Sequence, residues 1–69
     1  MIRIKSQLGD NRVLTLWFMA KWVTLATING KTVSTDAGNL YDAGQNHLAY
    51  CRRLVQIHLA KHGDDDGKR

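Results

Sequence analysis

The sequence predicts an α+β domain: an antiparallel sheet of three or four strands with one long C-terminal helix packed on it. Three observations predict this fold. Ile2 to Leu8 alternates apolar and polar residues, an Asn29-Gly30 dipeptide separates two strand-like segments, and a helical repeat runs from Asn39 to His62. Because 69 residues suffice for one domain only, we expect a single domain over residues 1–63 and a mobile polar tail over 64–69.

The first part of the chain is typical of two strands joined by a turn. Ile2 to Leu8 alternates with the period of a half-buried strand, and Gly9 to Asn11 supplies turn-forming residues. Val13 to Met19 is apolar on both alternating sets, which predicts a central strand, or one covered by a helix and by a partner. A helix over Arg12 to Trp22 is the competing interpretation. The sequence leaves open whether residues 13–28 form two strands or one bent strand.

The Asn29-Gly30 dipeptide predicts a second hairpin, because both residues accept the positive φ of a type I′ turn. A two-residue loop fixes the register of its strands, so we expect Ile28 to face Lys31. Neither face of this hairpin is cleanly polar, so both faces are expected to be covered.

The segment from Asn39 to His62 predicts the C-terminal helix. Asp36 or Asn39 can accept a backbone N–H bond as its N-cap, and Gly63 lies where a left-handed C-cap would end it. The residues of the apolar stripe expected to face the sheet recur at spacings of three and four: Leu40, Gly44, Leu48, Cys51, Val55 and Leu59.

The chain is basic, with a net charge of +4 and an isoelectric point of about 9.7. Eight basic residues against three aspartates give the body up to His62 a charge of +5, which attracts phosphate backbones or acidic protein surfaces. The lone Cys51 favours a reducing compartment. No segment reaches about 18 apolar residues, and the N-terminus does not read as a signal peptide. We therefore expect a cytoplasmic protein that does not contact membranes.

Four potential metal ligands, His47, Cys51, His58 and His62, project from one side of the predicted helix. One straight helix cannot bring all four to one ion, because Cys51 and His58 are separated by about 10 Å of helical rise. We expect these residues to make ordinary hydrogen bonds at the helix–sheet boundary, and we expect no metal and no cofactor. Paired carboxylates and a glycine-rich phosphate loop are also missing from the sequence, so we expect no catalytic residues and no enzyme.

Arginine, lysine, amide and tyrosine side chains make up the predicted binding surface. Its centre is Arg52-Arg53 on the outer face of the helix, and basic residues of the first hairpin extend it. Such side chains contact phosphates and base edges, and they also anchor protein interfaces. The complete set is Arg52, Arg53, Gln45, Gln56, Tyr50, Arg3, Lys5 and Arg12.

The run from Thr32 to Gly44 closes a hairpin and enters a helix that contains alanine and glycine. In this arrangement of strands followed by a helix, the chain resembles small proteins of phages and other mobile elements, including some anti-CRISPR proteins. The resemblance implies a non-enzymatic protein that binds and modulates or inhibits a host protein or nucleoprotein complex by covering a functional surface. The basic body departs from the acidic nucleic-acid mimics common among anti-CRISPR proteins. The alternatives are a small basic module that binds nucleic acid and a self-assembling subunit of a homo-oligomer.

Overall fold

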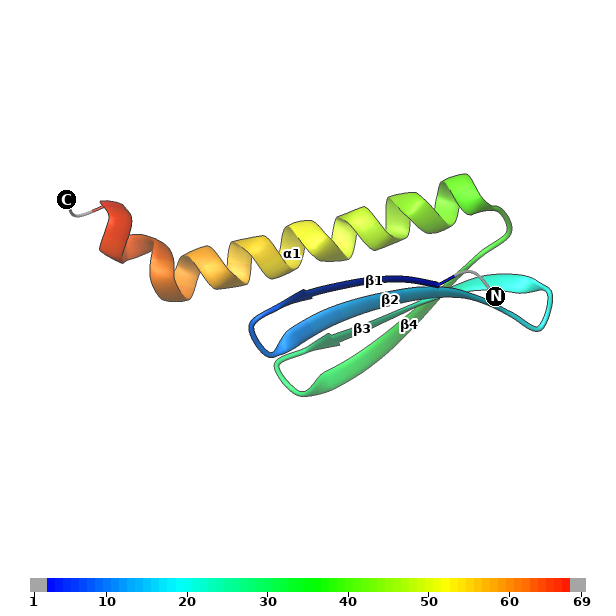
Figure 1. The fold of residues 1–69 in the computed structure, drawn as a ribbon, viewed down its shortest axis with the longest axis horizontal. Coiled ribbons are helices and arrows are strands. Elements are labelled where there is room, and N and C mark those ends of the chain that lie inside the picture. The colour runs from blue at the N-terminus through cyan, green and yellow to red at the C-terminus, as the bar shows by residue number, and fades with distance from the viewer. Residues whose placement is uncertain (1–2, 68–69) are drawn as a thin grey trace.

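The computed structural model describes the backbone of residues 3–67 and the side chains of residues 3–61. Ile2, the first residue of the predicted first strand, lies outside this range. The elements described are β1 (Arg3–Leu8), β2 (Asn11–Phe18), β3 (Lys21–Ile28), β4 (Lys31–Ala37) and α1 (Leu40–Gly67). The strands form one antiparallel sheet in the order β1-β2-β3-β4, and α1 packs along one face of it (Figure 1). The predicted α+β fold is confirmed, with four strands.

Residues 13–28 form two strands, so the competing predictions of a helix and of one bent strand are wrong. Phe18 of β2 pairs with Lys21 of β3, which leaves Met19 and Ala20 as a two-residue turn. Both turn residues have positive φ, 52° and 65°. This conformation brings Cβ close to the following carbonyl oxygen and costs roughly 1–2 kcal/mol per residue. The turn escaped sequence analysis because neither methionine nor alanine favours it.

The turn between β3 and β4 is the predicted one. Asn29 and Gly30 have φ of 53° and 83°, and Ile28 faces Lys31 in the predicted register. The backbone N–H of Asn29 donates a hydrogen bond to Oδ1 of the buried Asn11 at 2.9 Å. This bond ties the start of β2 to the second hairpin.

Exchanging the residue pairs of these two turns is expected to change stability in opposite directions. Met19→Asn with Ala20→Gly relieves two strained φ angles, so the free energy of unfolding should rise by about 1 kcal/mol. Asn29→Met with Gly30→Ala should lower it by about 1–2 kcal/mol through the backbone alone, because a Cβ at Gly30 meets open space. Urea unfolding of both double variants measures the two effects. A loss of stability in the first variant would contradict the assigned strain.

The covered face of the sheet packs on α1 in two small clusters. The first has Val13, Ala26 and Leu54 at its centre, with Leu8, Ile28, Tyr50 and Cys51 packed against them. The second consists of Trp22, Ala37 and Ala43. The largest fully buried side chains among the described residues are those of Val13, Thr15 and Thr24. The centre of the domain is therefore small and partly polar.

The predicted apolar stripe is wrong for most of its members, although Cys51 does pack against the first core cluster. Four of its members are about half exposed, with exposed fractions of 48–54%: Leu40, Leu48, Val55 and Leu59. Instead, α1 turns Ala43, His47 and Leu54 toward the sheet. The reason lies in the sheet, because the large ring of Trp22 leaves room for only a small residue such as Ala43, and Thr15 offers a hydroxyl to His47.

The helix begins as predicted, with Asn39 as its N-cap. Oδ1 of Asn39 accepts a hydrogen bond from the backbone N–H of Asp42 at 2.8 Å. Asp36, the other candidate cap, instead accepts a hydrogen bond from Nζ of Lys21 at 2.9 Å. The N-terminal turn is therefore held by a side-chain hydrogen bond, which sets the point where the chain leaves β4.

The helix continues to Gly67, so the C-cap predicted at Gly63 is wrong. A single glycine inside a helix costs about 1 kcal/mol and can be accommodated. The 28 residues of α1 span about 42 Å, whereas an eight-residue strand spans about 26 Å, so α1 extends past the turns at one end of the sheet (Figure 1). The domain boundary at residue 63 and the mobility of residues 64–69 remain predictions.

Candidate binding surface

The face of the sheet opposite α1 has an apolar centre. Leu14 pairs with Leu25 and Leu16 pairs with Val23, and all four side chains are partly buried. Because side chains alternate between the two faces of a strand, these four point away from the helix. Phe18, which is 56% exposed, extends the apolar strip along β2 to the strand's end. We call these five residues the open face.

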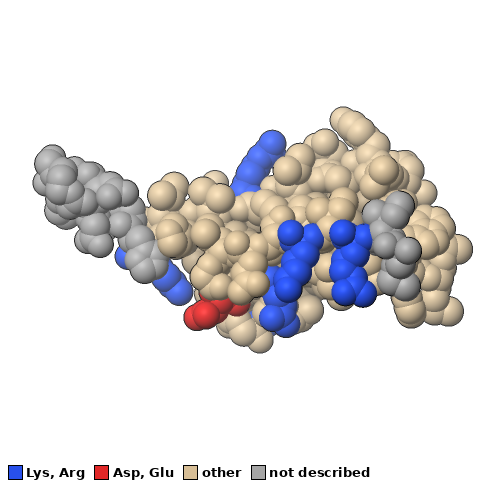
Figure 2. Space-filling model, viewed as in Figure 1, with Lys and Arg blue, Asp and Glu red and all other residues tan. Residues whose placement is uncertain are grey.

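A basic margin borders the open face along β1. Arg3 lies opposite Leu16 and Lys5 lies opposite Leu14, while Arg12 follows on β2 toward the first turn. All three cationic side chains are exposed. Figure 2 shows blue lysine and arginine side chains standing side by side on the sheet-bearing half of the molecule.

The opposite margin, along β4, is polar with little net charge. Ser34 lies opposite Leu25 and Asp36 lies opposite Val23. Asp36 forms an ion pair with Lys21 at 2.9 Å, and about half of each side chain is exposed. Such an exposed pair contributes about 0–1 kcal/mol to stability. The surface around the open face therefore has most of its positive charge on the β1 side.

The structure divides the predicted binding surface between two sides of the molecule. Arg3, Lys5 and Arg12 belong to the face that α1 leaves open, whereas Arg52 and Arg53 lie on α1 itself, which covers the other face. In Figure 2 a separate blue group projects from the helix-bearing side. The sequence predicted that the basic residues of the first hairpin extend the arginine pair of the helix. In the structure they do not, because the two groups lie on different sides of the molecule.

The remaining predicted residues lie on α1 in two different environments. Gln45 and Gln56 are exposed, and Gln56 lines shallow surface depressions with Arg52. Tyr50 packs against the first core cluster, and its hydroxyl lies 2.7 Å from Oγ1 of Thr35. The position of Tyr50 is therefore explained by its packing between α1 and the sheet.

His47 is buried between α1 and the sheet, where it joins a chain of hydrogen bonds. Its Nε2 lies 2.9 Å from Oγ of Ser6, and its Nδ1 lies 2.7 Å from Oγ1 of Thr15, which is 2.8 Å from Oγ1 of Thr24. Burial lowers the pKa of His47, so the imidazole is neutral at pH 7 and offers one N–H and one lone pair. The expectation of an ordinary hydrogen-bonded role at the helix–sheet boundary is confirmed for this histidine.

The Ser6–His47 pair has the spacing of a nucleophile and its base, and sequence analysis missed it. The two residues are 41 positions apart and lie on different elements. In hydrolases that use a serine nucleophile and a histidine base, a third group, commonly a carboxylate, orients the imidazole. Here the Thr15 hydroxyl holds that place and is itself bonded to a second hydroxyl. We interpret these four side chains as the polar part of the core, because they satisfy one another within it.

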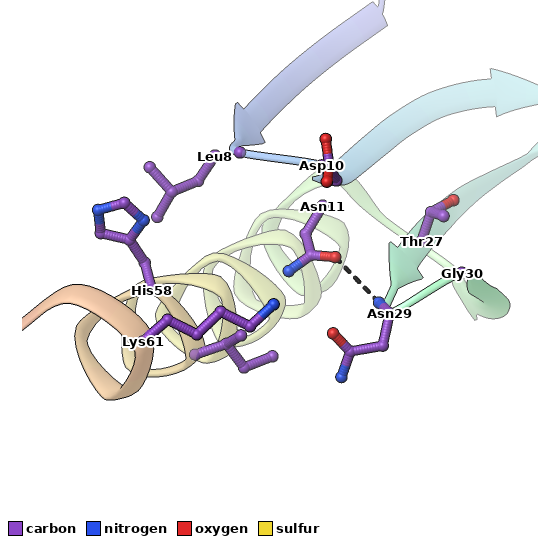
Figure 3. A pocket seen from close by; sticks show the side chains of 10 residues that line it. Leu8, Asp10, Asn11, Thr27, Asn29, Gly30, His58 and Lys61 are labelled. Carbon is purple, nitrogen blue, oxygen red and sulfur yellow. Dashed lines mark hydrogen bonds between the residues drawn. The ribbon is translucent and has the colours of Figure 1, made fainter.

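A surface hollow of about 450 Å³ lies where α1 extends over two hairpin turns (Figure 3). The Lys61 side chain reaches toward Asn11 and Asn29, and His58 lies beside Leu8. The full lining is Leu8, Gly9, Asp10, Asn11, Thr27, Asn29, Gly30, Ile57, His58 and Lys61. The length of α1 beyond the sheet creates this hollow.

The potential metal ligands have separate surroundings. His47 belongs to the buried hydrogen-bond chain, His58 lines the hollow, and Cys51 is partly buried at the margin of the first core cluster. The side chain of His62 lies outside the described residues. Within the described part of the chain, no three histidine, cysteine, aspartate or glutamate side chains are grouped to hold a metal ion.

Comparison with known protein families, with curated proteins and with solved structures finds no match for this chain. Within residues 3–67, no helix combines the length and apolar character needed to cross a lipid bilayer. The function is therefore inferred from the surfaces described above.

Proposed function

We propose that this chain is a non-enzymatic binding protein that uses the open face to bind and modulate a host macromolecular complex. The observation that carries this proposal is an apolar centre bordered by cations on the uncovered side of the sheet. An antiparallel sheet that packs a helix on one face commonly has a polar second face. Contiguous apolar residues at such a position mark contact sites for other molecules.

The composition of the open face suits a protein partner. Covering five partly exposed apolar side chains gains about 25 cal/mol for each Å² of apolar area removed from water. The cations on the margin accelerate and orient the approach of an acidic surface. The strained turn at the end of the strip places Met19 at 78% exposure, where it is available to a partner. A phage or mobile-element origin remains a prediction from the resemblance.

A basic nucleic-acid-binding module is the second candidate, favoured by the cations around the open face. Proteins that bind single strands combine a basic groove along the phosphates with aromatic rings on which the bases stack. Among the five residues of the open face, Phe18 is the aromatic one. Trp17 and Trp22 lie on the α1 side of the sheet, where their rings meet edge to face at 5.4 Å; Trp22 is buried, and Trp17 is 44% exposed but points away from the basic margin of the open face. This distribution favours a protein partner.

Photocrosslinking in the host cell tests the proposal. Phe18→p-benzoylphenylalanine places a reactive ring in the open face by a conservative replacement of an exposed ring. Gln56→p-benzoylphenylalanine places the same group in the predicted helix patch. We expect an adduct from position 18, absent from position 56, that falls about tenfold when Arg3→Glu and Lys5→Glu are added.

The fate of the adduct identifies the class of partner. An adduct degraded by protease but not by nuclease would agree with the proposal, and the reverse would favour the nucleic-acid candidate. Adducts from position 56 alone, or from neither position, would contradict the proposal. Circular dichroism of each variant confirms that the fold is retained.

A further inference from the structure

We propose that the partner segment bound by the open face is an amphipathic α-helix with an acidic flank. This inference rests on the proposed function and names the chemistry of its partner.

The shape of the open face fits a helix. Leu14, Leu16 and Phe18 follow one another along β2, so their side chains cover about 13 Å. Two turns of an α-helix rise about 11 Å and present a stripe of three or four apolar residues. The neighbouring Leu25 and Val23 widen the strip to two strands, which are about 4.8 Å apart. The domain already covers the other side of the sheet with a helix of its own.

The charge around the strip sets the flanks of the bound helix. The β1 side carries Arg3 and Lys5, with Arg12 nearby, so the flank lying over β1 should carry aspartate or glutamate. On the β4 side, Asp36 is neutralised by Lys21, and Ser34 adds a hydroxyl. The second flank should therefore be polar and uncharged.

A second copy of the chain fits the open face poorly. The exposed stripe of α1 contains Leu48 and Val55 but places Arg52 beside them, so docking it on the open face would bring arginine toward Arg3 and Lys5. Stacking two open faces would bring together two surfaces that each carry an excess of positive charge. Repulsion between like charges disfavours both arrangements.

Fluorescence anisotropy with synthetic peptides tests the partner chemistry. The probe is a stapled helix of about 18 residues with a leucine stripe and glutamates along one flank. A matched peptide replaces glutamate with lysine, a second scrambles the leucines around the helix, and an oligothymidylate of about 20 nucleotides represents nucleic acid. We expect the acidic peptide to bind at least about tenfold more tightly than the three other probes.

Variants of the full chain locate the bound peptide. Leu25→Asp, and separately Arg3→Glu with Lys5→Glu, should each weaken binding about tenfold, whereas Arg52→Glu with Arg53→Glu should change it less than about twofold. Leu25→Ser replaces Leu25→Asp if thermal unfolding shows that the aspartate disrupts the fold.

Several results would overturn the inference. One is that the lysine peptide or the oligothymidylate binds as tightly as the acidic peptide or more tightly. Another is that Arg52→Glu with Arg53→Glu abolishes binding of the acidic peptide. A sedimentation mass well above 7.8 kDa that Leu25→Asp reduces would identify a second copy as the occupant. Each of these results leaves the position 18 photoadduct as a separate test of the open face, whereas absence of that adduct would remove both proposals.

Discussion

Replacing Leu54 with alanine is expected to lower the free energy of unfolding by about 2–5 kcal/mol. Leu54 is 2% exposed and packs from α1 against Val13 and Ala26 at the centre of the first core cluster. A chain of 69 residues has a total stability of about 3–10 kcal/mol, so the variant should lose a large share of its stability and unfold at a much lower urea concentration. The small core has few other contacts to compensate for the cavity.

Leu59→Ala is the matched control, because it makes the same chemical change on the same helix. Leu59 is 54% exposed, so its replacement should cost less than about 1 kcal/mol. Urea unfolding followed by circular dichroism measures both variants. If Leu59→Ala were as destabilising as Leu54→Ala, the apolar stripe predicted from the sequence would have to face the sheet, which would contradict the orientation of α1.

Replacing His47 with glutamine is expected to cost about 1–3 kcal/mol at pH 7.5, the second largest effect. The glutamine amide cannot reproduce the two ring nitrogens that meet Ser6 and Thr15 at 2.9 Å and 2.7 Å. At least one buried polar group therefore loses its partner, and its desolvation is no longer offset. Unfolding in urea at pH 7.5 measures this loss.

The cost of this replacement is expected to shrink as the pH falls. Burial lowers the pKa of His47 in the folded state, so below about pH 6.5 the unfolded chain takes up a proton that the folded chain does not. The wild type thus loses stability between about pH 6.5 and the lowered folded pKa, and the glutamine variant lacks this term. The difference between the two unfolding free energies should narrow from pH 7.5 to pH 5. A difference independent of pH would contradict the neutral, buried state of His47.

Much of the fold was predictable because local signals agreed with long-range packing. The period of two in the first strand and the Asn29-Gly30 turn predicted the sheet, and the turn set the register of β3 and β4. Asn39 was one of two predicted N-caps for α1, and its side-chain hydrogen bond to the backbone N–H of Asp42 confirms it. These features depend on residues only a few positions apart, so a pattern in the sequence is sufficient to predict them.

The features that could not be predicted from the sequence depend mostly on contacts between α1 and the sheet. The buried side of α1 is rotated away from Leu48, Val55 and Leu59 because Thr15 binds His47 and Trp22 requires a small neighbour. The turn at Met19 and Ala20 escaped because its residues are unfavourable for that conformation. A signal for the polar core did exist, since Thr15 and Thr24 interrupt an otherwise apolar face of β2 and β3.

The residue types of the candidate binding surface were predictable from the sequence, but their grouping in space was not. The excess of basic residues and the two apolar faces of β2 were visible in the sequence. Their grouping was not, because only the three-dimensional arrangement places Arg3, Lys5 and Arg12 around the open face and moves Arg52 and Arg53 to the other side. Placing these residues requires knowing which face of the sheet the helix covers.

Methyl NMR during titration with the acidic helical peptide tests the role of the open face most directly. If this face is the contact surface, the methyl signals of Leu14, Leu16, Val23 and Leu25 should shift, while those of the buried Val13 and Leu54 should stay in place. Shifts confined to Leu48, Val55 and Leu59, or no shift in any methyl signal, would contradict this assignment.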